Sequence, residues 1–333
     1  MSDILRDQPL IVIVGTTASG KTHLGVELAK LVNGEVICAD SRTIYKGLDI
    51  GTAKPDTEEM QGIRHWGLDL VKPDDRFTVA DFKKYADAKI REIQSCGKIP
   101  ILVGGSGLYI DSVIYNYKFD NVIESDHKAI LEKQFKIRKQ FSGKRVDELR
   151  AYIHHSDISM PENSRNPRYL VRAIEKHVVD KNTTNDRDKI RANTIIFGIK
   201  MDKKVIRDRI KLRVSSMFSN PVFETEAQEA FKKYAPKFLE NIENSKWSIS
   251  DFYKNGVARR DFLKLPEALK SNIYLYKILE TNGIITKIKA EELAAIDDWH
   301  LAKKQTTWFS RNSSISWLSA EQLLEIFKNY HKD

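Results

Sequence analysis

Residues able to bind phosphate stand near the start of the chain, in the run Gly15-Thr16-Thr17-Ala18-Ser19-Gly20-Lys21-Thr22. The run fits the pattern G-x-x-x-x-G-K-[ST] of phosphate-binding loops, or P-loops. Backbone N–H groups of such a loop, together with the N-terminus of the following helix, favour anionic oxygens at one spot. Lys21 adds a positive charge, and the Thr22 hydroxyl is a candidate ligand for Mg²⁺. The run predicts a polyphosphate site, the alternative being an ordinary Gly-rich turn between a strand and a helix.

The segments on either side of this run fit a strand and a helix. Residues 10 to 14 are continuously apolar, as in a buried strand, and residues 23 to 31 have apolar positions at helical spacing. A second buried strand is predicted over Glu35–Ala39, and Asp40 follows it directly. Because ligands of open α/β sheets bind outside the carboxyl ends of the strands, we expect Asp40 to face the loop. The alternative role for Asp40 is to cap the next turn.

A second turn of the same kind occurs later in the first hundred or so residues. The apolar segment 99–103 leads into Gly104-Gly105-Ser106-Gly107, and apolar residues follow. Further strands are predicted over His65–Val71 and Thr194–Ile199. Two strand–glycine–helix turns indicate an α/β fold with a doubly wound parallel sheet of the P-loop type and helices on both faces.

The rest of the chain is predicted to be mostly helical. We expect residues 1–119 to form the first part of the P-loop core and residues 120–190 a helical insertion. Residues 191–333 then supply a return strand of the core and C-terminal helices. Thr78 is the expected N-cap of the first long helix. The predicted helices are Phe77–Ser95, Lys128–Arg150, Arg168–Val179, Val205–Phe218, Glu224–Lys237, Pro266–Glu280, Ala290–Phe309 and Ala320–Tyr330.

The composition narrows the class of protein. Of the 333 residues, 41% are hydrophobic and 30% charged, which suits a protein with a substantial core and no membrane span. No apolar run approaches the roughly 20 residues of a membrane helix. The polar start of the chain is not a signal peptide, so we expect a cytoplasmic protein. Cys38 and Cys96 are expected to be free thiols, and no Cys/His set has metal-ligand spacing.

The charge is unevenly distributed along the chain. The net charge is +9, and eleven lysines and arginines stand between residues 181 and 220 against four aspartates. The first hundred residues are nearly balanced, which suggests that one part binds a small anion and another part nucleic acid. The alternative is a solvated basic surface. Arg209 and Arg213 share one helix face and are candidates for a phosphate contact.

The motifs leave two classes of P-loop chemistry open. An ATP- or GTP-hydrolysing enzyme normally has an aspartate at the end of a hydrophobic strand to hold Mg²⁺. Here the strand that ends near residue 103 is followed by glycines and Ser106, although Asp40 and Asp69 could take that role. A P-loop kinase or nucleotide-driven switch therefore stays possible beside an enzyme that holds a different diphosphate.

Several stretches together match one known family. They are Thr17–Thr22, Asp40–Arg42 with Tyr45–Pro55, Leu102–Tyr109, Asn166–Glu175 and Ala302–Phe309. They resemble the bacterial tRNA dimethylallyltransferases, also called tRNA isopentenyltransferases or IPP transferases, over residues 11 to 310. The chain departs from the family pattern at Thr16, Ser106 and Lys304, where proline, threonine and arginine are usual. The Gly-Tyr segment of the family is not found between about residues 220 and 290.

The resemblance implies a transfer of the dimethylallyl group from dimethylallyl diphosphate to N6 of adenosine 37 in tRNA, 3′ of the anticodon, with release of diphosphate. Asp40 is then the general base, while Thr17 and Ser106 hydrogen-bond the phosphates or the reacting base. Lys21, and Mg²⁺ held by Thr22, neutralise the leaving group. The implied diphosphate-binding residues are Gly15, Thr16, Thr17, Ala18, Ser19, Gly20, Lys21, Thr22, Arg209 and Arg213.

The resemblance also implies a monomer whose insertion and C-terminal helices grip the anticodon stem-loop of tRNA through phosphates and shape. The implied tRNA-binding residues are Asp40, Ser41, Arg42, Thr43, Ser106, Arg168, Tyr169, Leu170, Val171, Arg172, Lys303, Lys304 and Gln305. Prenyl transfer to free AMP or ATP is an alternative that the basic insertion disfavours, because a small nucleotide needs no such platform. The presence of Lys21, Thr22 and Asp40 disfavours an inactive RNA-binding protein.

Overall fold

The structure is a computed structural model that describes residues 8–119, 133, 136–141, 143–179, 189–244, 265–270 and 272–328. Its contacts divide the chain into two compact units. The first unit combines Met1–Asn116 with Ile190–Asp333, and the second is Tyr117–Lys189. No helix among the described residues is long and apolar enough to cross a membrane.

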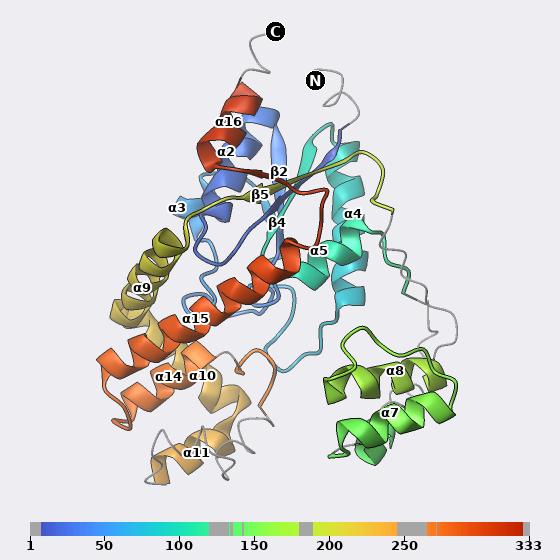
Figure 1. Cartoon of the computed structure of the whole chain (residues 1–333). Helices are drawn as coiled ribbons and strands as arrows, with labels where there is room; N and C mark the ends of the chain where they lie inside the picture. Colours follow the sequence, from blue (N-terminus) through green and yellow to red (C-terminus); the bar gives the residue numbers. More distant parts are fainter. Residues whose placement is uncertain are drawn as a thin grey trace. The chain divides into compact units, whose positions relative to one another are not determined.

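The first unit is built on a parallel sheet with the strand order β3-β2-β4-β1-β5-β6 (Figure 1). The central strand β1 pairs with β4 on one side and β5 on the other, with Ile11 opposite both Ile101 and Ile195. The predicted α/β fold with a parallel sheet is therefore confirmed. The strands are β1 (Leu10–Val14), β2 (Gly34–Ala39), β3 (His65–Trp66), β4 (Ile99–Gly104), β5 (Thr194–Ile199) and β6 (Ser316–Leu318).

Helices cover both faces of this sheet (Figure 1). Alternate side chains of a strand point to opposite faces, so Ile11 and Ile13 pack toward α2 (Lys21–Val32) and α16 (Ala320–Lys328). The other residues of β1 pack toward α4 (Val79–Ser95) and α5 (Gly107–Ile114) on the second face. Because both faces are buried, β1 is apolar at every position.

Helix α4 begins where the sequence predicts. The Thr78 side chain accepts a hydrogen bond from the Asp81 N–H, and the Asp81 carboxylate accepts one from the Thr78 N–H, which forms a capping box. This arrangement satisfies two backbone donors that a helix start otherwise leaves without partners. The predicted N-cap is confirmed.

Apart from the short α3 (Thr57–Met60), the remaining described helices of the first unit form a separate layer beyond the sheet (Figure 1). Their shared core contains Phe223, Phe231 and Tyr274, and the loop after β2 contributes Ile44 and Leu48 to it. The helical layer is thus joined to the sheet through this loop. The helices are α9 (Lys203–Ser219), α10 (Pro221–Tyr234), α11 (Pro236–Asn244), α14 (Asn272–Thr281) and α15 (Lys287–Phe309).

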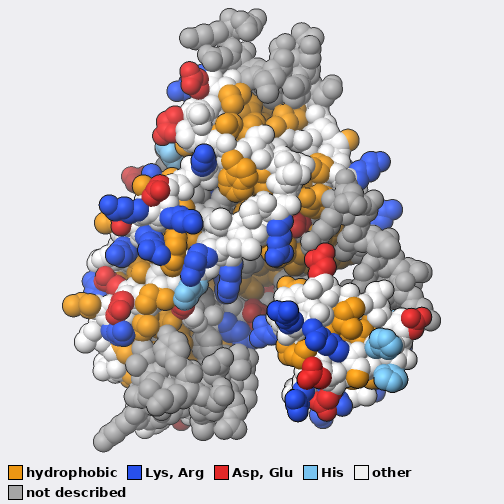
Figure 2. Space-filling view, in the orientation of Figure 1, with side chains coloured by type: hydrophobic (Ala, Val, Ile, Leu, Met, Phe, Trp, Pro, Cys, Tyr) orange, Lys and Arg blue, Asp and Glu red, His pale blue; other side chains and the backbone are white. Residues whose placement is uncertain are grey.

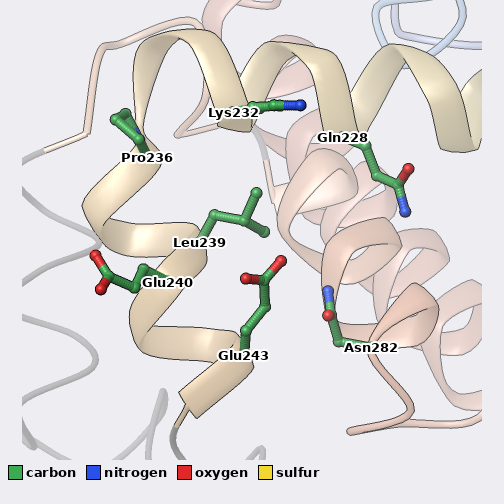
Figure 3. Close-up of a pocket in the computed structure, with 7 residues that line it drawn as sticks. All are labelled: Gln228, Lys232, Pro236, Leu239, Glu240, Glu243 and Asn282. Atoms are coloured by element: carbon green, nitrogen blue, oxygen red, sulfur yellow. The ribbon is translucent and has the colours of Figure 1, made fainter.

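A pocket opens in this layer between α10, α11 and the turn after α14 (Figure 3). Its walls are mixed in character, with a lysine, two glutamates, two amides and few apolar groups. It contains none of the site residues predicted from the sequence. The lining residues are Gln228, Lys232, Pro236, Leu239, Glu240, Glu243 and Asn282.

Proline and glycine account for two helices that were predicted wrongly. The predicted helix Glu224–Lys237 is broken at Pro236. Proline has no backbone N–H to donate to the preceding turn, and it instead begins α11. The single predicted helix Lys128–Arg150 is also wrong. Gly143 adopts a left-handed conformation with φ of 79°, and a new helix starts at residue 146. The first residues of that prediction lie outside the described part of the chain.

Two further predictions differ from the structure at their edges. The predicted strand His65–Val71 is reduced to β3, because Gly67 takes a φ of 88° and leaves the extended conformation. The predicted helix Pro266–Glu280 begins only at Asn272, and residues 267–270 form a turn. Strand β6 was missed, since a three-residue strand with two exposed positions has no apolar run to mark it.

The second unit has a small helical core of its own. Helices α7 (Val146–His155) and α8 (Pro167–Val179) pack on each other and on helical residues 136–141. Arg138 forms an ion pair with the Glu175 carboxylate at 2.5 Å. The buried apolar side chains are Ile137, Phe141, Leu149, Ile153, Leu170 and Ile174.

Candidate active site at the carboxyl edge of the sheet

The predicted phosphate-binding loop connects β1 to α2 and folds back on itself. Gly20 has a φ of 83° at the N-cap of α2, and Ala18 has a φ of 60°. The Thr16 carbonyl accepts hydrogen bonds from the Ser19 N–H at 3.3 Å and from Lys21 Nζ at 2.5 Å. The loop therefore curls around the start of α2, where unpaired N–H groups are expected to face a ligand.

Two hydroxyl groups in the loop suggest that a polar ligand belongs there. Thr16 Oγ1 and Ser19 Oγ are buried and have no hydrogen-bond partner among the described residues. Buried side-chain polar groups are nearly always paired in folded proteins. Hydroxyl groups can donate to phosphate oxygens, so a bound diphosphate would supply the partners.

The charges at this edge of the sheet influence one another. Burial lowers the pKa of Lys21 to about 8; the nearby Asp40 carboxylate opposes this change, and the Arg213 guanidinium adds to it. Asp40 directly follows β2, as predicted, and its Oδ1 accepts the Arg42 N–H at 2.8 Å. One carboxylate oxygen of Asp40 therefore caps the next turn, which is the alternative role left open by the sequence. The same carboxylate also lies near Lys21.

The second glycine turn is tied to the end of β2. The Ser106 hydroxyl accepts the Ser41 N–H at 2.9 Å, and the Ser106 N–H donates to the Ala39 carbonyl at 3.2 Å. A Cβ on Gly104 would lie 2.1 Å from the same carbonyl, so only glycine fits there. The turn therefore holds Ser106 beside the segment that begins with Asp40.

The two predicted arginines of α9 lie near the phosphate-binding loop. Arg209 Nη1 is 3.4 Å from the position that a Cβ would take on Gly20. Arg213 is half-buried and pairs with the Asp298 carboxylate at 2.5 Å, and its charge lowers the pKa of Lys21. Their contact with a diphosphate stays a prediction.

Gln305 occupies a different environment from the one predicted. It was expected on a tRNA-binding surface, but only 9% of it is exposed. Its Oε1 accepts the Thr17 N–H at 2.7 Å, and its Nε2 donates to the Gly105 carbonyl at 3.0 Å. The side chain therefore bridges the two turns of the site. The tRNA contact of this residue stays a prediction. Lys303 and Lys304, its neighbours in α15, are exposed.

The other predicted tRNA-binding residues differ in accessibility. Near Asp40, Ser41 is exposed, Arg42 donates to the Glu267 carbonyl at 2.9 Å, and Thr43 is buried. In the second unit, Arg168, Tyr169 and Arg172 are exposed on α8 and Val171 is half-buried. Leu170 is fully buried in the core of that unit, so its side chain is not exposed to solvent, and its contact with tRNA stays a prediction.

The structure allows Mg²⁺ but does not build a site from protein carboxylates. Thr22 is exposed at the start of α2. No group of three His, Cys, Asp or Glu side chains within the described residues could hold a metal ion. Mg²⁺ typically takes one or two protein ligands and completes its shell with phosphate oxygens and water. The Thr22 hydroxyl beside a diphosphate-binding loop fits that kind of site.

The cysteines Cys38 and Cys96 are both free, as predicted.

Sequence reasoning missed Tyr109, although it lies in one of the stretches that carry the family resemblance. Burial raises its pKa above the ordinary range, and the nearby Tyr45 and the Asp40 and Asp81 carboxylates act in the same direction. Its ring stacks on Phe82 with 4.2 Å between centroids. A tyrosine this close to Asp40 belongs to the wall of the site.

Glu226 and Tyr274 were also missed, and they hold the loop Tyr45–Pro55. The Glu226 carboxylate accepts the N–H groups of Asp49 and Ile50 at 2.9 Å, and that of Gly51 at 3.1 Å. The Tyr274 hydroxyl donates to the same carboxylate at 2.5 Å. No local signal in the sequence links a glutamate of α10 to a loop that precedes it by some 175 residues.

The fold and the site together define a class of protein: a P-loop α/β protein with an acidic residue beside its phosphate-binding loop. Comparison with known proteins gives the family. The family model described as IPP transferase matches residues 43–312, which is more than half of the chain. This chain belongs to the IPP transferase family.

Individual relatives agree over nearly the whole chain. The tRNA dimethylallyltransferase of Staphylococcus haemolyticus is 34% identical over 331 residues, covering 97% of this chain and 90% of the relative. The crystal structure of the tRNA isopentenylpyrophosphate transferase of Staphylococcus epidermidis has a TM-score of 0.60 at 31% identity and covers 97% and 99% of the two chains. The enzyme of the same name from Bacillus halodurans has a TM-score of 0.63 at 27% identity, covering 98% and 96%.

Proposed function

We propose that this chain transfers the dimethylallyl group of dimethylallyl diphosphate to N6 of an adenosine beside the anticodon of tRNA, releasing diphosphate. Membership of the family supports the proposal, because relatives are named tRNA dimethylallyltransferase. Within the structure, the proposal rests most on one observation. The Asp40 carboxylate lies close enough to Lys21 of the phosphate-binding loop to act on its pKa. A candidate base and a candidate diphosphate site thus share one edge of the sheet.

The bonds in this reaction assign a task to Asp40. The bond between C1 of the dimethylallyl group and the diphosphate oxygen breaks, and its electron pair leaves with the diphosphate. The lone pair of adenine N6 forms the new C–N bond, and N6 loses a proton to the Asp40 carboxylate. An exocyclic amine is a poor nucleophile, and a positioned base contributes typically about 10²–10⁴-fold.

The leaving group determines the task of the loop. As the C–O bond breaks, negative charge grows on the diphosphate, and donors already in place stabilise that charge. The proposed donors are Lys21, Arg209, Arg213 and the backbone N–H groups of residues 15–22 other than those of Thr17 and Ser19, which are bonded within the protein. Thr17 and Ser106 are proposed to orient the phosphates or the base. Mg²⁺, held by Thr22 and phosphate oxygens, would neutralise part of the same charge.

The tRNA is proposed to lie on the basic surfaces of both units. Figure 2 shows lysine and arginine side chains gathered over α9 and α15, where Lys303 and Lys304 are exposed. Arg168 and Arg172 are exposed on α8 of the second unit. The acceptor base must leave its stack to reach Asp40, and Ser41 is proposed to contact it. We expect the enzyme to act as a monomer in the cytoplasm.

The test is a transfer assay with label in the dimethylallyl group. The protein is incubated with labelled dimethylallyl diphosphate and Mg²⁺, and with tRNA, AMP or ATP in parallel reactions. Label is expected in tRNA, at an adenosine next to the anticodon. Label in AMP or ATP but not in tRNA, or ATP hydrolysis without transfer, would contradict the proposal.

A further inference from the structure

One long helix, α15, reaches the site from the far end of the chain. Residues 298, 302, 305 and 309 are spaced by four, three and four positions and therefore share one helix face. Ala302, Gln305 and Phe309 on this face are buried. Asp298, one turn earlier, pairs with Arg213, whose charge acts on Lys21. The face of α15 that meets the sheet thus contacts the surroundings of the diphosphate loop.

The fit between α15 and the second glycine turn is close. A Cβ on Gly105 would lie 2.4 Å from Gln305 Nε2, and one on Gly107 would lie 2.3 Å from the ring of Trp308. The Trp308 indole N–H also donates to the Asp111 carboxylate at 3.1 Å. Side chains of α15 therefore fill the space that the two glycines leave open, and the helix is held in register with the turn.

We infer that Gln305 is a positioning residue of the diphosphate site, which sets the separation between the phosphate-binding loop and the turn that carries Ser106. The inference rests on the proposed function. The Gln305 amide joins the two segments directly: its oxygen accepts the Thr17 N–H, and its nitrogen donates to the Gly105 carbonyl. The loop holds the leaving group and the turn faces the acceptor base. The amide therefore fixes the distance across which the dimethylallyl group moves.

Two properties of Gln305 separate this role from a tRNA contact. Both ends of its amide are already bonded within the protein, and the side chain is buried. The exposed Lys303 and Lys304 precede it on another face of the helix. Loss of the amide should thus change the chemical step and diphosphate binding while tRNA affinity stays the same.

The test compares Gln305→Met, Gln305→Glu and the wild type in the intact protein. Methionine keeps the volume and loses both hydrogen bonds, so the single-turnover transfer rate at saturating tRNA should fall by about 10- to 100-fold, as expected for a misplaced reacting group. The Kd of inorganic diphosphate should rise at least about threefold, because the loop is no longer held at Thr17. The Kd of tRNA and its salt dependence should not change.

Glutamate at position 305 provides a readout that depends on pH. An ionised carboxylate accepts the Thr17 N–H but cannot donate to the Gly105 carbonyl, whereas a protonated one does both. The rate of Gln305→Glu relative to wild type should therefore rise as the pH falls, while the relative rate of Gln305→Met stays flat. This rescue would not follow from a general loss of stability.

Gln322→Met is the matched control, since the Gln322 side chain is exposed and accepts the Ser319 N–H at 2.9 Å at the start of α16. Its rate and both affinities should equal those of wild type.

A normal transfer rate in Gln305→Met, or weaker tRNA binding with an unchanged rate, would overturn the inference. If the wild type fails to transfer the label, the proposed function is wrong. The diphosphate titration still tests the positioning role in that case, and an unchanged or lower Kd in Gln305→Met would refute it.

Discussion

Asp40 and Lys21 carry opposite charges at the same edge of the sheet, and each has a separate task in the proposed reaction. The carboxylate takes a proton from the acceptor amine, and the ammonium balances charge on the leaving group. The Asp40 carboxylate lies close enough to Lys21 to work against the lowering of the Lys21 pKa by burial. Substitutions at the two positions should therefore have different kinetic signatures.

The first prediction concerns Asp40. Asp40→Asn keeps the shape of the side chain and an oxygen for the Arg42 N–H, but an amide cannot take the proton from N6. We expect the transfer rate to fall at least about 10²-fold while the Kd of tRNA stays within error of wild type. Single-turnover rates and filter binding measure the two quantities. A rate close to that of wild type would remove Asp40 from the role of base.

The second prediction concerns the pH dependence of diphosphate binding. The pKa of Lys21 is about 8 in the free site, so the ammonium is charged below that pH and loses its proton above it. A bound anion favours the charged form. The affinity for inorganic diphosphate should thus decline as the pH rises through about 8. Calorimetric titrations of the wild type and Lys21→Met at several pH values test this prediction.

Lys21→Met serves as the reference because diphosphate itself titrates in the same range. Dividing the Kd of Lys21→Met by the Kd of the wild type removes that contribution. This ratio should be largest below pH 8 and shrink above it, because only the wild type loses a charge as the pH rises. A ratio that does not vary with pH would show that Lys21 does not titrate there.

Residue-scale chemistry was predictable where the motif is local. Gly15–Thr22 is contiguous, and Asp40 follows an apolar run, so pattern and strand polarity were enough to bring them together. The family resemblance implied a tRNA contact for Gln305 and gave no sign that the side chain is buried. Burial depends on which face of α15 packs inward, and packing with distant elements sets that face. Only the fold distinguishes a bridging amide from an exposed one.

At the scale of elements, the loop Tyr45–Pro55 is shaped by helices far away in the sequence. Three consecutive N–H groups of the loop converge on Glu226, and the ring of Tyr274 lies where a side chain on Gly51 would be, 2.5 Å from the Cβ position. Lys54 closes the other side with a hydrogen bond to the Tyr45 carbonyl at 2.9 Å. The loop follows Asp40, so these contacts also steady the site.

The third prediction tests this arrangement. Glu226→Ala leaves three backbone donors and the Tyr274 hydroxyl without their acceptor, which should lower the free energy of unfolding by about 1–3 kcal/mol. Tyr274→Phe removes only one of these hydrogen bonds and should cost about 1 kcal/mol or less. Urea denaturation measures both. Equal losses in the two variants would mean that the carboxylate does not act as the shared acceptor.

Element-scale prediction succeeded for the buried inner strands and failed for the two short edge strands and at two interruptions between helices. Thr194–Ile199 was predicted with its observed bounds, because a buried parallel strand is a short apolar run. The break at Pro236 and the turn at Gly143 were missed, since amphipathic spacing continues across both. The bonds of Glu226 join α10 to a loop early in the chain, and no local pattern records such a contact.

At the scale of the whole molecule, the excess of positive charge is concentrated on exposed helix faces. Lys203, Lys204, Arg207 and Lys211 are exposed on α9, and the α15 pair Lys303 and Lys304 adds to the same unit (Figure 2). Contacts of lysine with phosphates release counterions, so they contribute affinity that weakens with salt.

The fourth prediction uses that salt dependence. The double variant Lys303→Ala/Lys304→Ala should weaken tRNA binding and reduce the slope of log K against log salt concentration by about one to two. Binding of inorganic diphosphate should not change, because Gln305 faces the loop and these lysines do not. Binding titrations at several salt concentrations measure the slope, and an unchanged slope would count against phosphate contacts at both positions.

The fifth prediction asks whether both units hold one tRNA at the same time. Arg168 and Arg172 are exposed on α8 of the second unit, separate in the chain from the lysines of α15. Arg168→Ala/Arg172→Ala should also flatten the salt slope, by a similar amount. If one tRNA spans both units, the quadruple variant should show the sum of the two slope changes, as expected for independent sites. If the surfaces instead bind tRNA in alternative ways, the quadruple variant should lose less than the sum.

Leu170→Ala on the same helix should leave the slope unchanged and lower stability, because that side chain is buried in the core of the second unit.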